Sequence, residues 1–244
     1  MLMLLQQVPS APTDEIQVYD GHLAEVGTFN LTWHENFTPK GSEEPAFPGG
    51  LISNHAYVGV PEWAYGVTKW FELGLYMPLY SFTKDYGSSL NGFKLRTLFA
   101  VPKADQRTFV YGLNLEFSWN AKQWDEKRYT NEIRPIIGWH LGDTDIIVNP
   151  IMDNSYVGVK NLEFVPASRV AHKFLPNWTF ALEEYADYGR LHHISPLHDQ
   201  SHQLWFVADH TTKHGIEMEP GIGVGMTAGS DKLTLKLILS RDLN

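Results

Sequence analysis

The chain has 244 residues, of which 43% are hydrophobic and 13% aromatic, and its formal net charge is −9. This acidic balance argues against nucleic acid as a partner, because phosphate binding needs a clustered basic surface. The absence of cysteine excludes disulfides, thiolate metal sites and cysteine nucleophiles. No apolar run reaches the roughly 18 residues that a membrane-spanning helix needs.

The first residues resemble the end of a signal peptide. A short apolar run, residues 1–5, is followed by Pro9-Ser10-Ala11, where small residues resemble a cleavage region. We therefore expect residues 1–14 to be a partial signal peptide or a disordered tail. Residues 15–244 are expected to form one domain, since no internal repeat or linker interrupts them.

From residue 27 onward, apolar and polar side chains alternate. In residues 108–120, for example, Phe109 and Phe117 fall on one face and Asn114 and Glu116 on the other. Period-two alternation is typical of β-strands. About twelve segments follow this pattern. They are residues 27–37, 56–67, 70–80, 91–101, 108–120, 129–140, 144–154, 162–174, 178–188, 202–210, 215–226 and 232–241.

Two features place these strands in a membrane rather than in a soluble sheet. At about 10–13 residues each, tilted strands cross the roughly 25 Å apolar band of an outer membrane. Long polar connections, such as residues 38–55, 81–90 and 121–128, alternate with short turns such as Gly142-Asp143 and Pro176-Asn177. The sequence thus predicts an all-β fold, a single antiparallel up-and-down transmembrane β-barrel of about 12 strands.

Two kinds of residue conflict with regular strands in lipid. Proline cannot donate a backbone hydrogen bond, so prolines within strands predict local bulges. Six are expected there, namely Pro61, Pro78, Pro135, Pro150, Pro166 and Pro220. Glu184 is a second exception, because it falls on the lipid-facing phase of its strand.

Several stretches resemble small bacterial outer-membrane barrels. They are residues 59–67 with Trp70-Phe71-Glu72-Leu73-Gly74, residues 132–138, and the glycine-spaced residues 221–225. Some of these poorly characterised barrels are associated with meta-pathway phenol degradation and transport. The resemblance implies a monomer in the outer membrane of a Gram-negative bacterium, surrounded by membrane lipid and lipopolysaccharide. It also implies a channel or transporter for small solutes, including aromatic or hydrophobic ones.

Charged residues on the polar face of each strand, opposite to the lipid-facing apolar face, are expected to line the lumen. They are Lys94, Arg96, Glu116, Glu132, Arg134, Asp145, Arg169, Glu183, Asp187, Asp209, Glu217, Glu219 and Lys236. Symmetric hairpin registers would bring Lys94, Glu116 and Arg134 together. Interleaved charges of this kind either fill the lumen, giving a structural barrel, or form a selective constriction for a solute.

No catalytic, metal or cofactor site is predicted. The loop histidines His192, His193, His198 and His202 lack compelling ligand spacing. His34, His140 and Ser168 lie in strands, and no Gly-x-Ser-x-Gly motif occurs. The alternatives to a channel are an outer-membrane lipid-modifying enzyme and a soluble β-barrel or sandwich that binds an apolar ligand.

Overall fold

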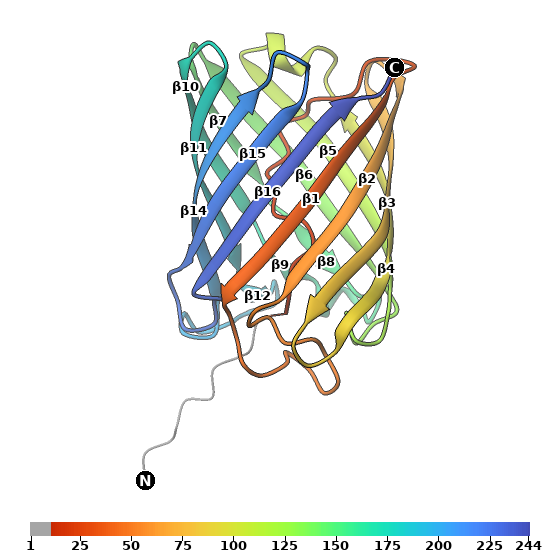
Figure 1. Cartoon of the computed structure of the whole chain (residues 1–244), viewed down its shortest axis with the longest axis vertical. Coiled ribbons are helices and arrows are strands. Elements are labelled where there is room, and N and C mark those ends of the chain that lie inside the picture. The colour runs from red at the N-terminus through yellow and green to blue at the C-terminus, as the bar shows by residue number, and fades with distance from the viewer. Residues whose placement is uncertain (1–10) are drawn as a thin grey trace.

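A computed structural model describes residues 11–244 as an all-β protein. Residues 1–10, most of the expected signal peptide or tail, lie outside the described residues. Twelve long strands form a closed antiparallel barrel, in which the first strand pairs with the last (Figure 1). The long strands are β1 (Phe29–Lys40), β2 (Tyr57–Thr68), β3 (Phe71–Thr83), β4 (Gly87–Ala100), β5 (Phe109–Asn120), β6 (Tyr129–Leu141), β7 (Thr144–Asn149), β10 (Ala167–Leu175), β11 (Trp178–Asp187), β14 (Ser201–Thr211), β15 (Glu217–Gly225) and β16 (Leu233–Asp242). The predicted fold class is confirmed.

Short elements extend the barrel wall at one end. Four short strands add to the sheet there: β8 (Met152–Asn154), β9 (Glu163–Phe164), β12 (Gly189–Arg190) and β13 (His193–Ile194). Two single-turn 3-10 helices cover residues 104–106 and 159–161. Among residues 11–244, no helix is both long enough and apolar enough to cross a membrane.

The two ends of the barrel differ in their connections. At the end we call the long-loop end, residues 41–56, 121–128 and 188–200 join neighbouring strands. At the opposite short-turn end, residues 69–70, 142–143 and 176–177 form two-residue turns, and residues 101–108 and 212–216 form the longer connections. The expected long loop over residues 81–90 is wrong, because β3 and β4 continue and leave only residues 84–86 between them. Cross-strand pairing, such as Ser81 opposite Ser89, explains the longer strands.

Several prolines interrupt the ladder, as the sequence predicts. Register shifts occur between Gly59 and Glu62, around Pro61, and between Tyr76 and Leu79, around Pro78. Pro150 and Pro166 each follow the end of one strand segment and precede the next. By contrast, Pro135 and Pro220 stay in regular register with Leu113 and Leu237.

The shift at Pro78 changes which side chains of β3 face the lumen. Regular alternation places Leu79 on the outer face with Leu75, but Leu79 is only 1% exposed. Tyr80 instead points outward and donates a hydrogen bond to Glu35 Oε1 at 2.6 Å. One extra residue in a strand moves every following side chain to the opposite face. Regular alternation therefore predicts the wrong face for the residues of β3 that follow Pro78.

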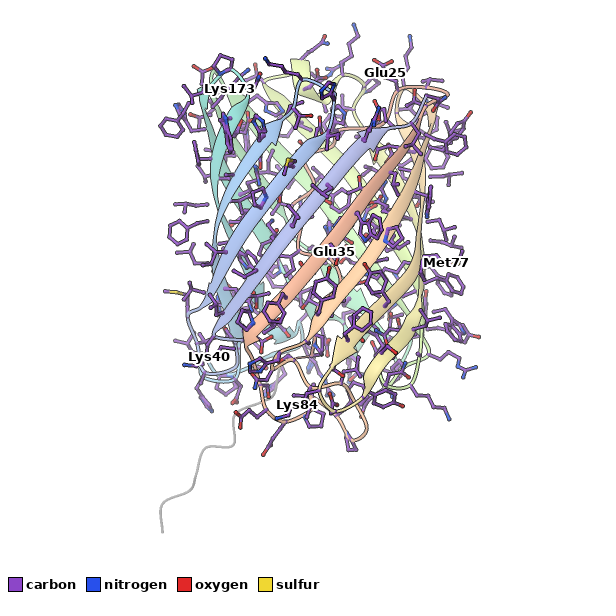
Figure 2. All side chains as sticks on the ribbon, in the orientation of Figure 1. Glu25, Glu35, Lys40, Met77, Lys84 and Lys173 are labelled. Atoms are coloured by element: carbon purple, nitrogen blue, oxygen red, sulfur yellow. The ribbon has the colours of Figure 1, made fainter. Side chains whose placement is uncertain are left out.

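The outer surface is apolar and the inner surface is polar. On β5, Phe109, Tyr111 and Phe117 are exposed, whereas Asn114 and Glu116 are buried inside the barrel. Figure 2 shows apolar and aromatic side chains pointing away from the wall around the barrel. In water such a surface would be costly, and in lipid it removes apolar area from water.

Two carboxylates lie on this outer face. Glu35, labelled at mid-height in Figure 2, is held by Tyr80, whose hydroxyl also accepts a hydrogen bond from Trp33 Nε1 at 3.0 Å. Glu184 lies near the long-loop end, 3.2 Å from His202 Nδ1. Hydrogen bonding to neighbouring side chains lowers the cost of a carboxyl group in an apolar setting.

Residues 12–21, here named the lumen segment, pass through the interior of the barrel. The segment enters from the long-loop end and leaves at the short-turn end, where the chain turns into β1 (Figure 1). Most of its residues are buried. Asp14, which the sequence places in the tail, therefore lies inside the barrel together with Glu15.

Leu95 tests the outer apolar band, because it lies mid-strand and is half exposed. We expect Leu95→Arg to lower the free energy of unfolding by about 2–4 kcal/mol, the cost of a cation near the bilayer midplane. Leu141→Arg, at the end of β6 beside a short turn, is the matched control and should cost about 0–1 kcal/mol. Urea titration in lipid vesicles measures both, and equal costs would show that the outer band is not embedded.

Candidate functional site

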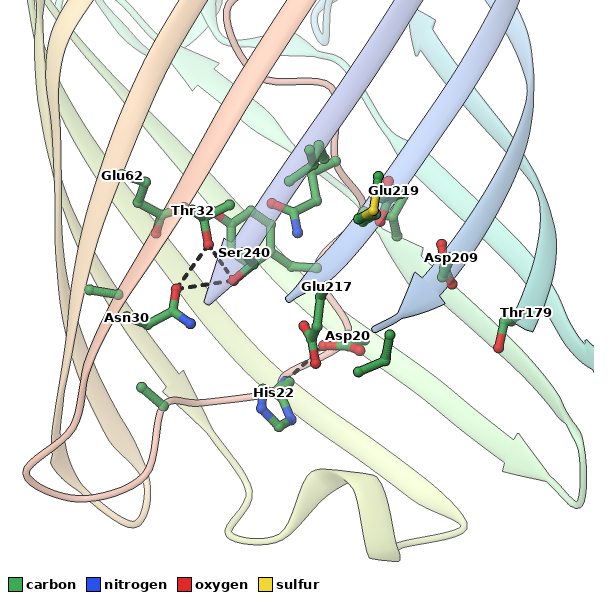
Figure 3. A pocket seen from close by; sticks show the side chains of 18 of the residues that line it. Asp20, His22, Asn30, Thr32, Glu62, Thr179, Asp209, Glu217, Glu219 and Ser240 are labelled. Carbon is green, nitrogen blue, oxygen red and sulfur yellow. Dashed lines mark hydrogen bonds between the residues drawn. The ribbon is translucent and has the colours of Figure 1, made fainter. Parts of the chain in front are cut away.

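Within residues 11–244, a cavity lies at each end of the lumen. The short-turn cavity has a volume of about 480 Å³ and is lined by Asp20, Asp209 and Glu217 among others (Figure 3). The long-loop cavity measures about 890 Å³ and is lined by Glu116, Trp124 and others. The lumen segment contributes residues to both cavities and fills the space between them.

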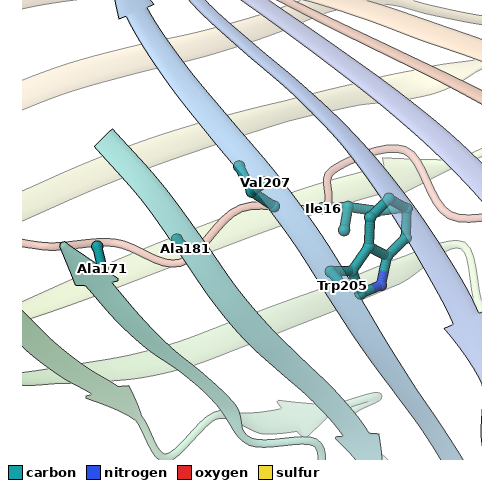
Figure 4. Close-up of a cluster of buried hydrophobic side chains, with 5 residues drawn as sticks. All are labelled: Ile16, Ala171, Ala181, Trp205 and Val207. Atoms are coloured by element: carbon teal, nitrogen blue, oxygen red, sulfur yellow. The ribbon is translucent and has the colours of Figure 1, made fainter. Parts of the chain in front are cut away.

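Apolar side chains of the lumen segment pack against the inner wall. Ile16 joins Ala171, Ala181, Trp205 and Val207 in one buried cluster, in which Trp205 is fully buried (Figure 4). In the same way, Val18 packs with Ile147, Ile151 and Ala167, and Tyr19 packs with Leu98 and Ile136. These contacts remove apolar surface from water and fix the depth of the segment in the barrel.

Wall amides bind the backbone of the segment. Asn149 accepts a hydrogen bond from Tyr19 N at 2.8 Å and donates one to Tyr19 O at 2.9 Å. Nearer the long-loop end, Asn36 Nδ2 donates to Asp14 O at 2.8 Å and to Thr13 O at 3.0 Å. A buried backbone without a strand neighbour requires such partners, because unpaired N–H and C=O groups are costly inside a protein.

A first ionic network joins the segment to β4, β5 and β6. Lys94 Nζ lies 2.7 Å from Asp14 Oδ2 and 3.6 Å from Glu116 Oε2. Arg134 binds both oxygens of Glu132, at 2.6 and 3.0 Å, and its Nη1 lies 3.4 Å from Glu15 Oε1. The segment's two carboxylates thus pair with two wall cations.

The predicted Lys94–Glu116–Arg134 group forms only in part. Lys94 and Glu116 interact, but across residues 11–244 no ion pair or hydrogen bond joins Glu116 to Arg134. The register explains this, because Glu116 lies opposite Glu132, and Arg134 lies opposite Asn114. The register of β5 and β6 thus differs by two residues from the symmetric hairpin expected from the sequence.

Arg96 belongs to a separate group on β2, β3 and β4. It binds Glu62 Oε1 at 2.5 Å and also binds Glu72, while His34 Nε2 lies 3.2 Å from Glu62 Oε2. Glu62 and Glu72 were not among the predicted lumen residues. Glu62 shares its inner face with Val58 and Val60, so alternation alone gives no polar face there. Alternation does identify Glu72 as a lumen residue, because this charged side chain lies on the face of its strand opposite to Phe71 and Leu73.

A second ionic network lies across β10, β11, β14, β15 and β16. Lys236, whose side chain is fully buried, binds Glu183 Oε2 at 2.7 Å, Glu219 Oε1 at 2.6 Å and the carbonyl of Ile16 at 3.0 Å. Arg169 binds Glu183 and Asp209. All five charged residues were selected from sequence, and the structure brings them together.

The remaining predicted residues line the cavities without joining these networks. Asp145 lies at the short-turn cavity, 2.5 Å from His140 Nδ1. Glu217 lines the same cavity (Figure 3). Asp187 lines the long-loop cavity and accepts a hydrogen bond from Gly189 N at 2.7 Å.

Acidic side chains outnumber basic ones around both cavities. The short-turn cavity is lined by eight aspartates and glutamates and by three arginines. The long-loop cavity is lined by eleven acidic side chains and four lysines or arginines. Acidic side chains therefore exceed basic ones by five around the short-turn cavity and by seven around the long-loop cavity.

Lys236 tests the importance of the second network. We expect Lys236→Met to lower the free energy of unfolding by roughly 3–5 kcal/mol, because Glu183 and Glu219 lose a buried partner. The exposed loop variant Lys122→Met should change stability by at most about 0.5 kcal/mol. If urea titration gives the two variants the same stability, the network is not a structural requirement.

Comparison with known proteins supports the fold and gives no close relative. No protein family model matches the chain, and no curated protein matches it in sequence. Among the solved structures that resemble it are three bacterial outer-membrane barrels. An outer membrane channel from Pseudomonas putida F1 has a TM-score of 0.64 at 12% identity, covering 94% of this chain and all of that one.

The other two structures are porins. The KdgM porin gives a TM-score of 0.58 at 7% identity, covering 88% of this chain and 99% of that one. The NanC porin gives 0.57 at 10% identity, covering 88% of this chain and 100% of that one. The expected resemblance to small bacterial outer-membrane barrels is confirmed, and the chain has the fold of outer-membrane channels.

Proposed function

We propose that this protein is an outer-membrane channel for small solutes, closed in the present conformation by the lumen segment. The observation that carries the proposal is a charged lumen with a cavity at each end, enclosed by a wall whose outer face is apolar. A barrel that served only as a scaffold could fill its interior with apolar side chains. Polar lumen linings are typical of barrels that conduct solutes.

The long-loop end would face the outside of the cell, and the short-turn end the periplasm. Bacterial outer-membrane barrels have short periplasmic turns and longer extracellular loops. In this arrangement the outer band contacts membrane lipid, and the loops lie beside lipopolysaccharide. Pairing of β1 with β16 closes the wall within a single chain, which supports a monomer.

The way in which the lumen segment is held supports a removable closure. Its residues belong to none of the strands that pair in the barrel wall. Individual side chains hold it instead, including Asn36, Asn149 and Lys236. Opening the lumen would break these contacts and leave the wall's backbone ladder intact.

The lining of the long-loop cavity suggests which solutes pass. Phe47, Trp124 and Tyr185 offer aromatic surface, in keeping with the aromatic solutes that the sequence resemblance implies. The surplus of carboxylates favours neutral or positively charged solutes over anions.

An outer-membrane enzyme is the second candidate, and the side-chain geometry gives it little support. His34 and His140 contact Glu62 and Asp145, respectively. Ser168 lies on the phase of β10 opposite the lumen-facing Arg169. Within residues 11–244, no hydrogen bond joins a serine hydroxyl to a histidine ring, the pairing that serine nucleophiles require.

Loosening the lumen segment should open the channel. We expect the double variant Asn36→Ala, Asn149→Ala to raise single-channel conductance or open time several-fold in planar bilayers, because each loss frees buried backbone groups of the segment at about 1–3 kcal/mol. Replacement of residues 12–20 by glycine and serine should raise the conductance further.

Asn177→Ala, in an exposed turn at the short-turn end, is the matched control and should conduct like the unaltered protein. Liposome swelling with small sugars and amino acids gives an independent measure of solute flux. If the segment-replaced barrel folds, as judged by its heat-modifiable gel mobility, and still passes no ion or solute, the lumen is a structural plug and the channel proposal fails.

A further inference from the structure

We infer that the long-loop cavity binds an extended organic cation that carries more than one ammonium group. The inference rests on the proposed function and names a class of solute for it. It arises from a row of carboxylates in the cavity wall, from one carboxylate of the lumen segment, and from the aromatic side chains beside them.

Four acidic residues lie directly opposite one another on successive strands. Glu116 on β5 pairs with Glu132 on β6, Glu132 with Asp153 on β8, and Asp153 with Glu163 on β9. All four line the long-loop cavity. Like charges at directly opposed positions destabilise a sheet. Three strand spacings of about 4.8 Å give the row a length of about 14 Å.

The protein's own cations balance this row only in part. Arg134 is bound to Glu132, and Lys94 lies nearer to Asp14 than to Glu116. Arg190 on β12 lies opposite Glu163 at the end of the row, but no ion pair joins the two within residues 11–244. The Asp153 side chain has no hydrogen bond or ion pair within residues 11–244, although nearby Asn154 does. A row with this excess of negative charge suits a ligand that brings positive charge.

Glu15 adds a carboxylate to the same cavity from the lumen segment. Its side chain is 2% exposed and its Oε1 lies 3.4 Å from Arg134 Nη1. Its Oε2 is buried and accepts no hydrogen bond within residues 11–244. Glu15 is also one of the residues that line the cavity. A buried oxygen without a donor is costly, and an ammonium N–H would satisfy it.

The geometry favours an organic cation over a metal ion. Within residues 11–244, no three His, Asp or Glu side chains converge closely enough to hold a metal. The carboxylates are instead spread along the row, as the separated charges of a polyammonium chain require. Trp124 and Tyr185 line the same cavity, and aromatic faces attract alkylammonium groups.

Spermidine, a linear triamine, is a suitable probe, and isothermal titration of the full chain in detergent micelles measures its binding without requiring an open lumen. We expect saturable binding that weakens as salt is raised. Asp153→Asn should raise the Kd about tenfold or more, because one charge-assisted contact is lost. Glu43→Gln removes the same charge from an exposed loop at the same end and should leave the Kd unchanged.

The possible results separate this inference from the channel proposal. No binding of spermidine, equal Kd values for Asp153→Asn and Glu43→Gln, or equally tight binding of Mg²⁺ would each overturn the organic-cation site. If solute flux through the segment-replaced barrel persists in that case, the channel proposal stands. Specific spermidine binding to the full chain, together with no flux through the folded segment-replaced barrel, would support the site and overturn the channel.

Discussion

The interior of this barrel depends on the pairing of its buried cations with the lumen segment. Lys94 binds Asp14, Arg134 approaches Glu15 and binds the carbonyl of Gln17, and Lys236 binds the carbonyl of Ile16. Removing charges from water costs several kcal/mol for each ion unless good partners replace the water. The segment supplies part of that replacement, so the buried charges of the lumen are stable with the segment in place.

The wall tolerates such an interior because its two faces are independent. A closed barrel satisfies its backbone through strand pairing, so the side chains facing lipid and those facing the lumen can be chosen separately. Where proline interrupts the ladder, the wall adapts locally. Beyond Pro78 the inward face of β3 changes phase, which buries Leu79 and carries Tyr80 outward to Glu35.

The sequence predicted the wall better than its contents. Period-two alternation identified the strands, because it reflects the lipid and lumen faces directly, and it selected charged residues such as Lys236 and Arg169 that do form a network. It could not place residues 12–21, whose position depends on contacts with strands more than a hundred residues away, such as that between Tyr19 and Asn149. Nor could it set the register, since a shift of two residues leaves the alternation unchanged.

That same shift decides the chemistry of the long-loop cavity. In the symmetric register, Glu116 would face Arg134 and the two charges would neutralise each other. In the register of the structure, Glu116 faces Glu132, and the row continues through Asp153 to Glu163. A fold shared with outer-membrane channels therefore does not determine which ligand the lumen would bind. Strand register, which changes neither the fold nor the outer apolar band, sets the sign of the charge along this part of the wall.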